Sequence, residues 1–252
     1  VAAVGEGVTG FEVGAPVFGI GAGSYAAYAV APAAALARRP AQLDAVAAAA
    51  LPVSGCTALQ AVRDHAGVAA GQRVLVIGAS GGVGSHVVQL AVAAGAEVTG
   101  VASAAKRDFV LGLGARDVID YEREEIDARG GGYDAVIDIG GNRPLRAVRR
   151  VLSPRGRLLI VGGEHGGPLL GGIDRLMRAR VLSLFGRRPM GGMLGRTTSA
   201  DLATLADAVV AGTLRPAVTR TYRLAEAGAA LRDLGAGRVS GKAVILIGAD
   251  RS

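Results

Sequence analysis

The sequence predicts an α/β protein whose core is a doubly wound parallel sheet. From Arg73 onward, short apolar runs alternate with segments of helical periodicity, which is the pattern of strands joined by covering helices. A glycine-rich turn follows the first of these runs and opens the first helix. Residues 1–36 and 214–247 instead contain short strand-like segments, so a smaller β region made from both chain ends is expected.

The elements can be assigned one after another along the chain. Near-continuous apolar strands indicate a sheet covered on both faces, and helical connections imply parallel strands with right-handed crossovers. Strands of this sheet are predicted at residues 73–78, 97–102, 117–120, 133–139, 157–161 and 180–185, and helices at 82–94, 106–113 and 144–152. The C-terminal part adds strands at 214–223 and 242–247 and a helix at 224–234.

Length and composition exclude several classes of protein. With 252 residues, 50% of them hydrophobic and 19% charged, the chain can bury a large core and is not disordered. Its 40 glycines show no three-residue period, which excludes collagen. The sequence contains no run of about 20 strongly apolar residues that would predict a membrane-spanning helix. It shows no secretory signal either, so a cytoplasmic location is expected.

The numbers and positions of cysteine, histidine and arginine bear on disulfides, metal sites and charged partners. A single cysteine, Cys56, excludes an internal disulfide framework and a thiolate metal cluster. Three dispersed histidines offer no pair with metal-ligand spacing, so no metal site is expected. The net charge of +7 is mostly arginine, and the densest basic stretch, residues 143–157, contains no aromatic residue. That stretch fits a solvated helix face better than an anionic partner, and neither nucleic acid nor membrane is expected as a partner.

The glycine-rich turn, residues 78–84 with the sequence GASGGVG, is the strongest motif. It lies between a buried strand and a helix, which is the context that nucleotide binding requires. A pyrophosphate must approach the backbone N–H groups of a helix N-terminus, where a Cβ atom would block it. The motif therefore favours nucleotide binding over a merely tight turn between strand and helix.

The end of the second strand bears on the choice of cofactor. An acidic residue there would accept hydrogen bonds from the ribose of NAD, but the strand ends at Ser103 without a carboxylate, and Lys106 and Arg107 follow. A hydroxyl and two cations suit a 2′-phosphate, which favours NADPH over NADH. The alternative is that the two cations only solvate a helix start. Tyr121, after the third strand, either reaches the same adenosine end or is a half-buried tyrosine at a strand end.

Seven segments of the chain, in the same order, resemble the zinc-independent medium-chain dehydrogenases/reductases, the quinone oxidoreductase-like group. The resemblance implies a Rossmann domain that binds NADP(H) and a partial GroES-like β domain formed by both chain ends. It also implies hydride transfer to a quinone, enone or similar conjugated carbonyl without zinc. The matching segments are VGEGVTGFEVGAPVFG (4–19), LPVSGCTALQAV (51–62), RVLVIGASGGVGSHVVQLA (73–91), GARDVIDYERE (114–124), YDAVIDIGG (133–141), GRLLIVGG (156–163) and GRVSGKAVILIG (237–248).

The resemblance also implies roles for individual residues. Thr57 lies near the nicotinamide, although it is equally readable as a helix-cap hydroxyl. Lys242 is a weaker candidate for a phosphate contact. The remaining implied contacts are Gly81, Gly82 and Val83 along the pyrophosphate, Ser103, Lys106 and Tyr121 at the 2′-phosphate, and Gly162 and Gly163 at the nicotinamide ribose or amide.

The proton donor and the substrate stay open. Tyr25 and Tyr28 lie in a segment expected to be β structure near a domain junction, where they can equally be ordinary packing residues. The other candidate donors are Ser24, Thr57 and, less favoured, His165, with Cys56 the least favoured nucleophile. Two alternatives to a quinone or enone reductase also stay open. The protein can be an enoyl-thioester reductase, or a nucleotide-binding protein without catalytic activity.

The resemblance starts inside the first domain of the family. We therefore expect residues 1–50 to be an N-terminal piece of the catalytic domain, residues 51–212 the nucleotide-binding domain, and residues 213–252 the return to the catalytic domain. An incomplete β domain would expose strand edges and give weak or no turnover by residues 1–252 alone. The family commonly dimerises through the edge of its Rossmann sheet, so a homodimer through residues 180–185 is expected.

Overall fold

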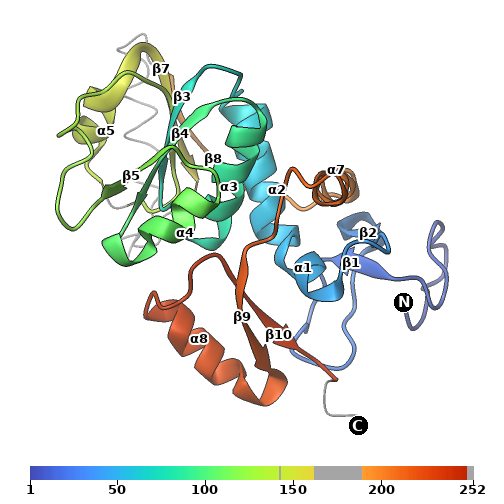
Figure 1. The fold of residues 1–252 in the computed structure, drawn as a ribbon. Helices are drawn as coiled ribbons and strands as arrows, with labels where there is room; N and C mark the ends of the chain where they lie inside the picture. Colours follow the sequence, from blue (N-terminus) through green and yellow to red (C-terminus); the bar gives the residue numbers. More distant parts are fainter. Residues whose placement is uncertain (142, 162–188, 249–252) are drawn as a thin grey trace, which may run out of the picture. The chain divides into compact units, whose positions relative to one another are not determined.

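The computed structural model describes residues 1–141, 143–161 and 189–248. The chain forms two compact units, one made of Val1–Cys56 with Arg196–Ser252 and the other of Thr57–Gly195 (Figure 1). The boundary between them falls within helix α2 (Pro52–Gln60), which continues as a π-helical turn at Ala61–His65. The domain limits expected from the sequence stay a prediction.

Thr57–Gly195 contains the predicted parallel sheet. Its described strands run in the order β5-β4-β3-β6-β7-β8, and all neighbours are parallel. This order reverses direction between β3 and β6, as in a doubly wound Rossmann sheet. The fold class predicted from the sequence is confirmed. The strands are β3 (Arg73–Ile77), β4 (Glu97–Ala102), β5 (Asp117–Asp120), β6 (Tyr133–Asp138), β7 (Leu152–Val161) and β8 (Met190–Met193).

Alternate residues of each strand enter two separate apolar clusters. In β3, Val74 and Val76 pack into one cluster, and Leu75 and Ile77 into the other, because successive side chains of a strand point to opposite faces. The first cluster includes residues of α2 and α3 (Gly82–Ala93), and the second includes residues of α5 (Leu145–Val151). The sheet is therefore covered on both faces (Figure 1).

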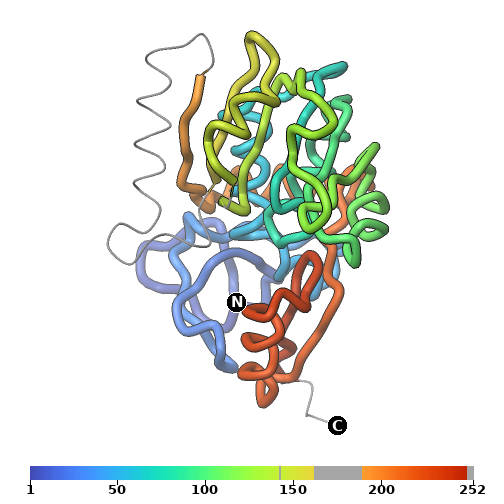
Figure 2. Tube along the Cα trace, turned by 90° about the vertical axis from the view of Figure 1, so that its left-hand side faces the viewer, coloured from blue at the N-terminus to red at the C-terminus, as the bar shows by residue number. Residues whose placement is uncertain are grey.

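Strand β8 was not predicted. Its sequence, MGGM, has two central glycines and no apolar run, yet it pairs in parallel with β7 (Figure 2). Tertiary pairing overrides its weak local propensity. The predicted strand at residues 180–185, and with it the expected dimer contact, lies outside the described residues. The unit also contains helix α4 (Arg107–Gly112), which follows a 3₁₀ turn at Ala104–Lys106.

The other unit combines the two ends of the chain. Strands β1 (Val17–Gly19) and β2 (Leu36–Arg38) pair antiparallel, with a 3₁₀ turn at Ala33–Ala35, while the predicted C-terminal strands form a parallel pair. Helices α1 and α7 are additions that the alanine-rich sequence did not reveal. The remaining elements are α1 (Ala45–Ala50), α7 (Ser199–Val210), β9 (Val218–Arg223), a 3₁₀ turn at Leu224–Glu226, α8 (Ala227–Gly235) and β10 (Lys242–Leu246).

The expectation for Tyr25 and Tyr28 was wrong. Residues 23–29 form turns and bends rather than a strand, apart from one bridge that joins Ala22 to Val30. The two tyrosines are 58% and 79% exposed, so they are not packing residues of a small core. Glycines at positions 21 and 23 and the lack of a paired strand beside this segment explain the irregular backbone.

The described residues contain neither a candidate membrane-spanning helix nor a candidate metal-binding group of side chains. No helix there is both long and apolar enough to cross a bilayer. No group of three or more His, Cys, Asp or Glu side chains there is arranged to hold a metal ion.

Candidate dinucleotide-binding site

Helix α3 begins at the point where the sheet reverses its strand order. Gly81 is its N-cap residue, with an extended backbone, and no side chain caps this helix end. The first-turn N–H groups of Gly82 and Val83 have no acceptor within the helix by geometry. Together with the helix dipole, they form an anion site at the carboxyl end of β3, where the sequence places a pyrophosphate.

Gly84 allows this helix end to approach the preceding turn. A Cβ atom at position 84 would lie 2.1 Å from the carbonyl oxygen of Gly78 and 2.9 Å from Cα of Ala79. Both are backbone atoms, which cannot swing aside as a side chain does. The turn therefore requires glycine here for close packing.

Two buried side chains hold the first turn of α3 in place. Ser85 Oγ donates to the carbonyl oxygen of Gly82 at 3.1 Å, and Nδ1 of His86 lies 2.7 Å from the same oxygen. Both residues are fully buried. The sequence analysis did not single them out, because a serine and a histidine inside a helix carry no pattern of their own. They orient the helix end and do not face a ligand.

The turn after β6 lies beside the glycine-rich turn. The N–H groups of Ile139 and Gly140 donate to the carbonyl oxygen of Ile77 at 3.0 and 3.3 Å. The fully buried Asp138 accepts a hydrogen bond from the N–H of Gly141 at 2.9 Å. The two turns on either side of the switch point are thus joined through backbone atoms. A rigid crevice of this kind is where open α/β sheets bind ligands.

Ser103, Lys106 and Tyr121 lie in the segments that follow the carboxyl ends of β4 and β5. The N–H of Tyr121 donates to the carbonyl oxygen of Ala102 at 3.3 Å, which joins the turn after β5 to the end of β4. Ser103 and Lys106 flank the 3₁₀ turn that follows β4. The side chain of Tyr121 is 47% exposed, so it is accessible to a ligand.

Arg107 is already engaged by other groups. Its guanidinium donates to the carbonyl oxygen of Val118 at 2.7 Å and pairs with Asp117 at 3.2 Å. Burial alone would raise the pKa of Asp117, but hydrogen bonds from the N–H of Val118 and from Arg107, with the charge of Arg129, hold this pKa below its ordinary value. Of the two cations that follow β4, Lys106 remains the candidate for a 2′-phosphate.

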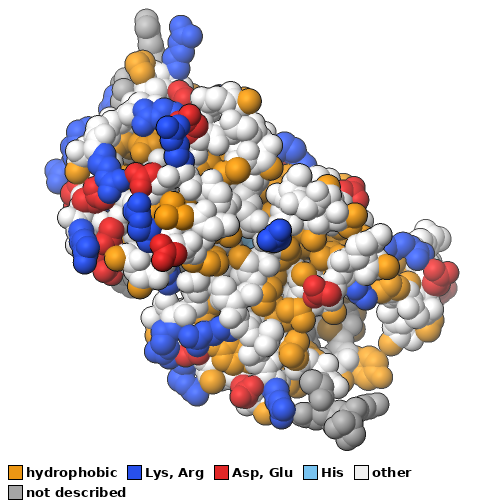
Figure 3. Space-filling model, viewed as in Figure 1, with side chains coloured by type: hydrophobic (Ala, Val, Ile, Leu, Met, Phe, Trp, Pro, Cys, Tyr) orange, Lys and Arg blue, Asp and Glu red, His pale blue; other side chains and the backbone are white. Residues whose placement is uncertain are grey.

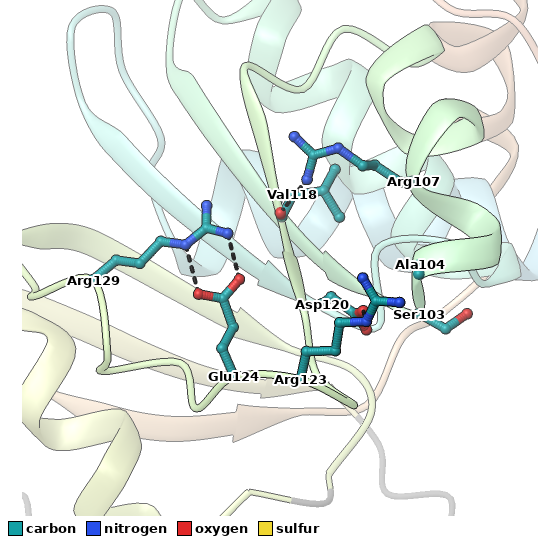
Figure 4. A pocket seen from close by; sticks show the side chains of 8 residues that line it. All are labelled: Ser103, Ala104, Arg107, Val118, Asp120, Arg123, Glu124 and Arg129. Atoms are coloured by element: carbon teal, nitrogen blue, oxygen red, sulfur yellow. Dashed lines mark hydrogen bonds and ion pairs between the residues drawn. The ribbon is translucent and has the colours of Figure 1, made fainter.

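A pocket of about 220 Å³ opens beside the carboxyl ends of β4 and β5 (Figure 4). Arg129 closes one side of it by a two-pronged ion pair with Glu124 and a further ion pair with Asp117. Ser103 is the one predicted site residue in its wall. The pocket is lined by Ser103, Ala104, Arg107, Val118, Asp120, Arg123, Glu124 and Arg129.

Thr57 is held by a contact that the sequence did not predict. It is the sixth residue of α2, so the alternative that it caps a helix is wrong. A Cβ atom at Gly195, in the segment after β8, would lie 2.2 Å from Oγ1 of Thr57. The segment after β8 therefore runs directly over the Thr57 side chain.

Lys242 lies in the other unit. Its ammonium group donates to Oγ of Ser54 at 3.1 Å, and burial lowers the pKa of Lys242.

The remaining candidate residues are placed as follows. Cys56 is 1% exposed, which argues against a role as nucleophile, and Ser24 is exposed. Gly162, Gly163 and His165 lie outside the described residues.

Comparisons with known proteins agree with this architecture. A profile of the zinc-binding dehydrogenase family matches residues 113–245. A quinone oxidoreductase of Sus scrofa is 33% identical over 98% of this chain and 77% of its own length. A chloroplast envelope quinone oxidoreductase homolog of Arabidopsis thaliana is 40% identical over 63% of this chain, and the match spans about half (52%) of that relative.

One relative is part of a much larger protein. The spectinabilin polyketide synthase system protein NorB of Streptomyces orinoci is 36% identical over 97% of this chain, but the match spans 11% of NorB.

Solved structures give the same result. The quinone oxidoreductase of Coxiella burnetii superimposes with a TM-score of 0.82 at 30% identity, over 96% of this chain and 75% of that one. The mycobacterial protein Rv1454c, solved in complex with NADPH, superimposes with a TM-score of 0.81 at 28% identity, over 98% and 79% of the two chains. The chain therefore belongs to the zinc-binding dehydrogenase family of medium-chain dehydrogenases/reductases, in its quinone oxidoreductase-like group.

Proposed function

We propose that this oxidoreductase uses NADPH in preference to NADH and transfers hydride to a quinone, enone or similar conjugated carbonyl without a zinc ion. The observation that carries the cofactor preference is the end of β4. This strand ends at Ala102 and Ser103 without a carboxylate, and Lys106 and Tyr121 flank it. A 2′-phosphate brings close to two negative charges, which a carboxylate at this position would repel and an ammonium group attracts.

The described residues fit such a cofactor at its other contacts. The uncapped end of α3 suits a pyrophosphate, and Gly84 lets this helix end pack closely on the preceding turn. Bound NADPH supplies the hydride. The residues of this chain bind it, orient it and shield it from water.

Reduction of a conjugated carbonyl places negative charge on the carbonyl oxygen, which a hydrogen-bond donor stabilises. Thr57 is the candidate for a hydroxyl near the nicotinamide, since the segment after β8 holds its side chain from one side. Ser24, Tyr25 and Tyr28 are exposed donors in the other unit.

Fluorescence titration tests the cofactor preference. The unmodified protein should bind NADPH at least about tenfold more tightly than NADH, the ratio expected for one or two charged hydrogen bonds. Lys106→Ala should reduce this ratio several-fold by weakening NADPH binding alone. Arg155→Ala, which removes an exposed arginine on β7, is the matched control and should leave the ratio unchanged. Equal affinities for the two cofactors in the unmodified protein would refute the preference.

Reduction of an enoyl thioester, the alternative that the sequence leaves open, is the second candidate, and the match of 97% of the chain to a polyketide synthase system protein is compatible with it. NADPH consumption measured side by side with a quinone, an enone and a crotonyl thioester separates the two functions. A specificity constant highest for the thioester would replace the first proposal with the second. NADPH binding without turnover of any of the three would instead support a catalytically silent protein.

A further inference from the structure

The pocket beside β4 and β5 contains three arginines, and two of them are already engaged. Arg129 is held by Glu124, and Arg107 by the carbonyl oxygen of Val118 (Figure 4). Both arginines also pair with Asp117. Neither side chain can turn to a ligand without breaking several hydrogen bonds. Their charges are also neutralised within the protein, so they add little attraction for an anion.

Arg123 differs from both. Its described ionic partner is Asp120, and the Nε to Oδ2 distance of 3.5 Å is longer than a good hydrogen bond. Its side chain is 82% exposed. A weak, exposed ion pair costs little to separate, so the guanidinium of Arg123 is the available cation of this pocket.

Asp120 explains why Arg123 stays at this position in the free protein. Its Oδ1 atom accepts a hydrogen bond from the N–H of Glu122 at 3.1 Å. Its Oδ2 atom is buried and accepts no hydrogen bond from the part of the chain that the structure describes. A buried carboxylate oxygen without a donor is unfavourable. The nearby charge of Arg123 is the compensation that the structure offers.

Ser103 lines the same pocket as Arg123 and Asp120. The sequence places the 2′-phosphate of the cofactor at Ser103, and a planar guanidinium binds phosphate oxygens through two parallel hydrogen bonds. We propose that Arg123 is a second cationic contact for the 2′-phosphate, held in the free protein by Asp120 and released to the phosphate on binding. This inference rests on the proposed use of NADPH.

The exchange of partners makes the pair a device for cofactor selection. A 2′-phosphate carries more charge than Asp120 and offers oxygens that can accept two hydrogen bonds, so it outcompetes the 3.5 Å ion pair. The 2′-hydroxyl of NADH offers no such charge, and Arg123 then stays with Asp120. The negative charge of Asp120 still repels the phosphate after Arg123 has left it, so Asp120 limits the affinity gained by the exchange.

Calorimetric titration with 2′,5′-ADP and 5′-AMP tests this inference without turnover. Arg123→Ala should weaken binding of 2′,5′-ADP about tenfold and change binding of 5′-AMP less than about twofold. Asp120→Asn keeps the acceptor for the N–H of Glu122 but removes the charge, so it should strengthen binding of 2′,5′-ADP several-fold. Arg116→Ala, which removes an exposed arginine paired with Glu97 at 2.7 Å, is the matched control.

The outcomes separate this inference from the proposed function. If the unmodified protein binds 2′,5′-ADP no better than 5′-AMP, the NADPH preference fails, and the role of Arg123 fails with it. If it prefers 2′,5′-ADP but Arg123→Ala behaves like Arg116→Ala, the role of Arg123 alone is refuted. Equal losses for both ligands with Arg123→Ala would also refute it, because they would indicate a structural effect. Thermal melts of each variant confirm that the fold is retained.

Discussion

Gly195 shows how a single missing side chain positions a candidate site residue. A Cβ atom there would overlap Oγ1 of Thr57 at 2.2 Å and approach its Cβ at 3.0 Å. Gly195→Ala should therefore displace Thr57 or the segment after β8. We expect a loss of about 1–3 kcal/mol in the free energy of unfolding and a several-fold weaker binding of NADPH. Gly191→Ala, on β8 with no atom within 4 Å of the added Cβ, is the control and should change neither quantity.

A double-mutant cycle assigns this effect to the contact with Thr57. Thr57→Ala removes the overlapping oxygen, so the combination with Gly195→Ala should cost at least about 1 kcal/mol less than the sum of the single variants. Denaturant unfolding measures the three free energies. Strictly additive losses would show that the strain lies elsewhere.

At the residue scale, the sequence predicts features that depend on residues close together in the chain. The glycines at the start of α3 and the carboxylate-free end of β4 follow from the strand–turn–helix pattern alone. The contact between Gly195 and Thr57 joins residues far apart in the chain. Nothing distinguishes Gly195 from the other 39 glycines until the fold is known.

At the scale of a whole element, helix α7 begins with a side-chain cap. Thr198 is its N-cap, and its Oγ1 atom accepts a hydrogen bond from the N–H of Asp201 at 3.1 Å while donating to that carboxylate. This threonine–aspartate pair is a recognisable helix-start signal, although the sequence analysis did not use it. Strand β8 carried no comparable signal, because two glycines occupy its centre.

The N-cap of α7 can be tested directly. Thr198→Ala should lower the free energy of unfolding by about 1 kcal/mol, because the N–H of Asp201 loses its acceptor. Thr198→Ser keeps the oxygen and should retain most of the stability. Thr204→Ala, in the same helix, removes only an exposed hydroxyl bonded to Ala200 and serves as control. If Thr198→Ala is as mild as Thr204→Ala, the cap contributes little.

At the scale of the whole molecule, part of the positive charge is paired with nearby carboxylates. In the basic stretch, Arg143 pairs with Glu125 at 3.1 Å and Arg150 with Asp127 at 2.5 Å. The hydrogen bond from Arg150 holds the pKa of Asp127 below its ordinary value. Figure 3 likewise shows basic and acidic side chains interspersed on the drawn face. The two ion pairs, with the mixed charges of the drawn face, support a solvated helix face for this stretch.

The hydrogen bond between Lys242 and Ser54 joins residues 188 positions apart. Burial lowers the pKa of Lys242, so the folded state disfavours its charged form. Between the lowered native pKa and the ordinary value of an exposed lysine, the unfolded chain binds more protons, and stability should rise with pH. Below both values the full cost of the buried charge is present.

The variant Lys242→Met removes this titration. The difference in the free energy of unfolding, Lys242→Met minus unmodified protein, should decrease as the pH rises from 7 toward the ordinary lysine range. Denaturant unfolding at a series of pH values measures it. A difference that is constant with pH would show that the Lys242 pKa is the same in the folded and unfolded chain.

The sequence by itself determined the parallel sheet, the glycine-rich turn that opens α3 and the absence of a carboxylate at the end of β4. These features depend on residues close together in the chain, where periodicity and backbone sterics act directly. Only the tertiary structure decided that β8 is a strand, that Gly195 packs on Thr57 and that Arg123 is an exposed, weakly paired arginine in the pocket that Ser103 lines. Each of these depends on which distant groups meet and which charges are already paired, and local patterns do not contain that information.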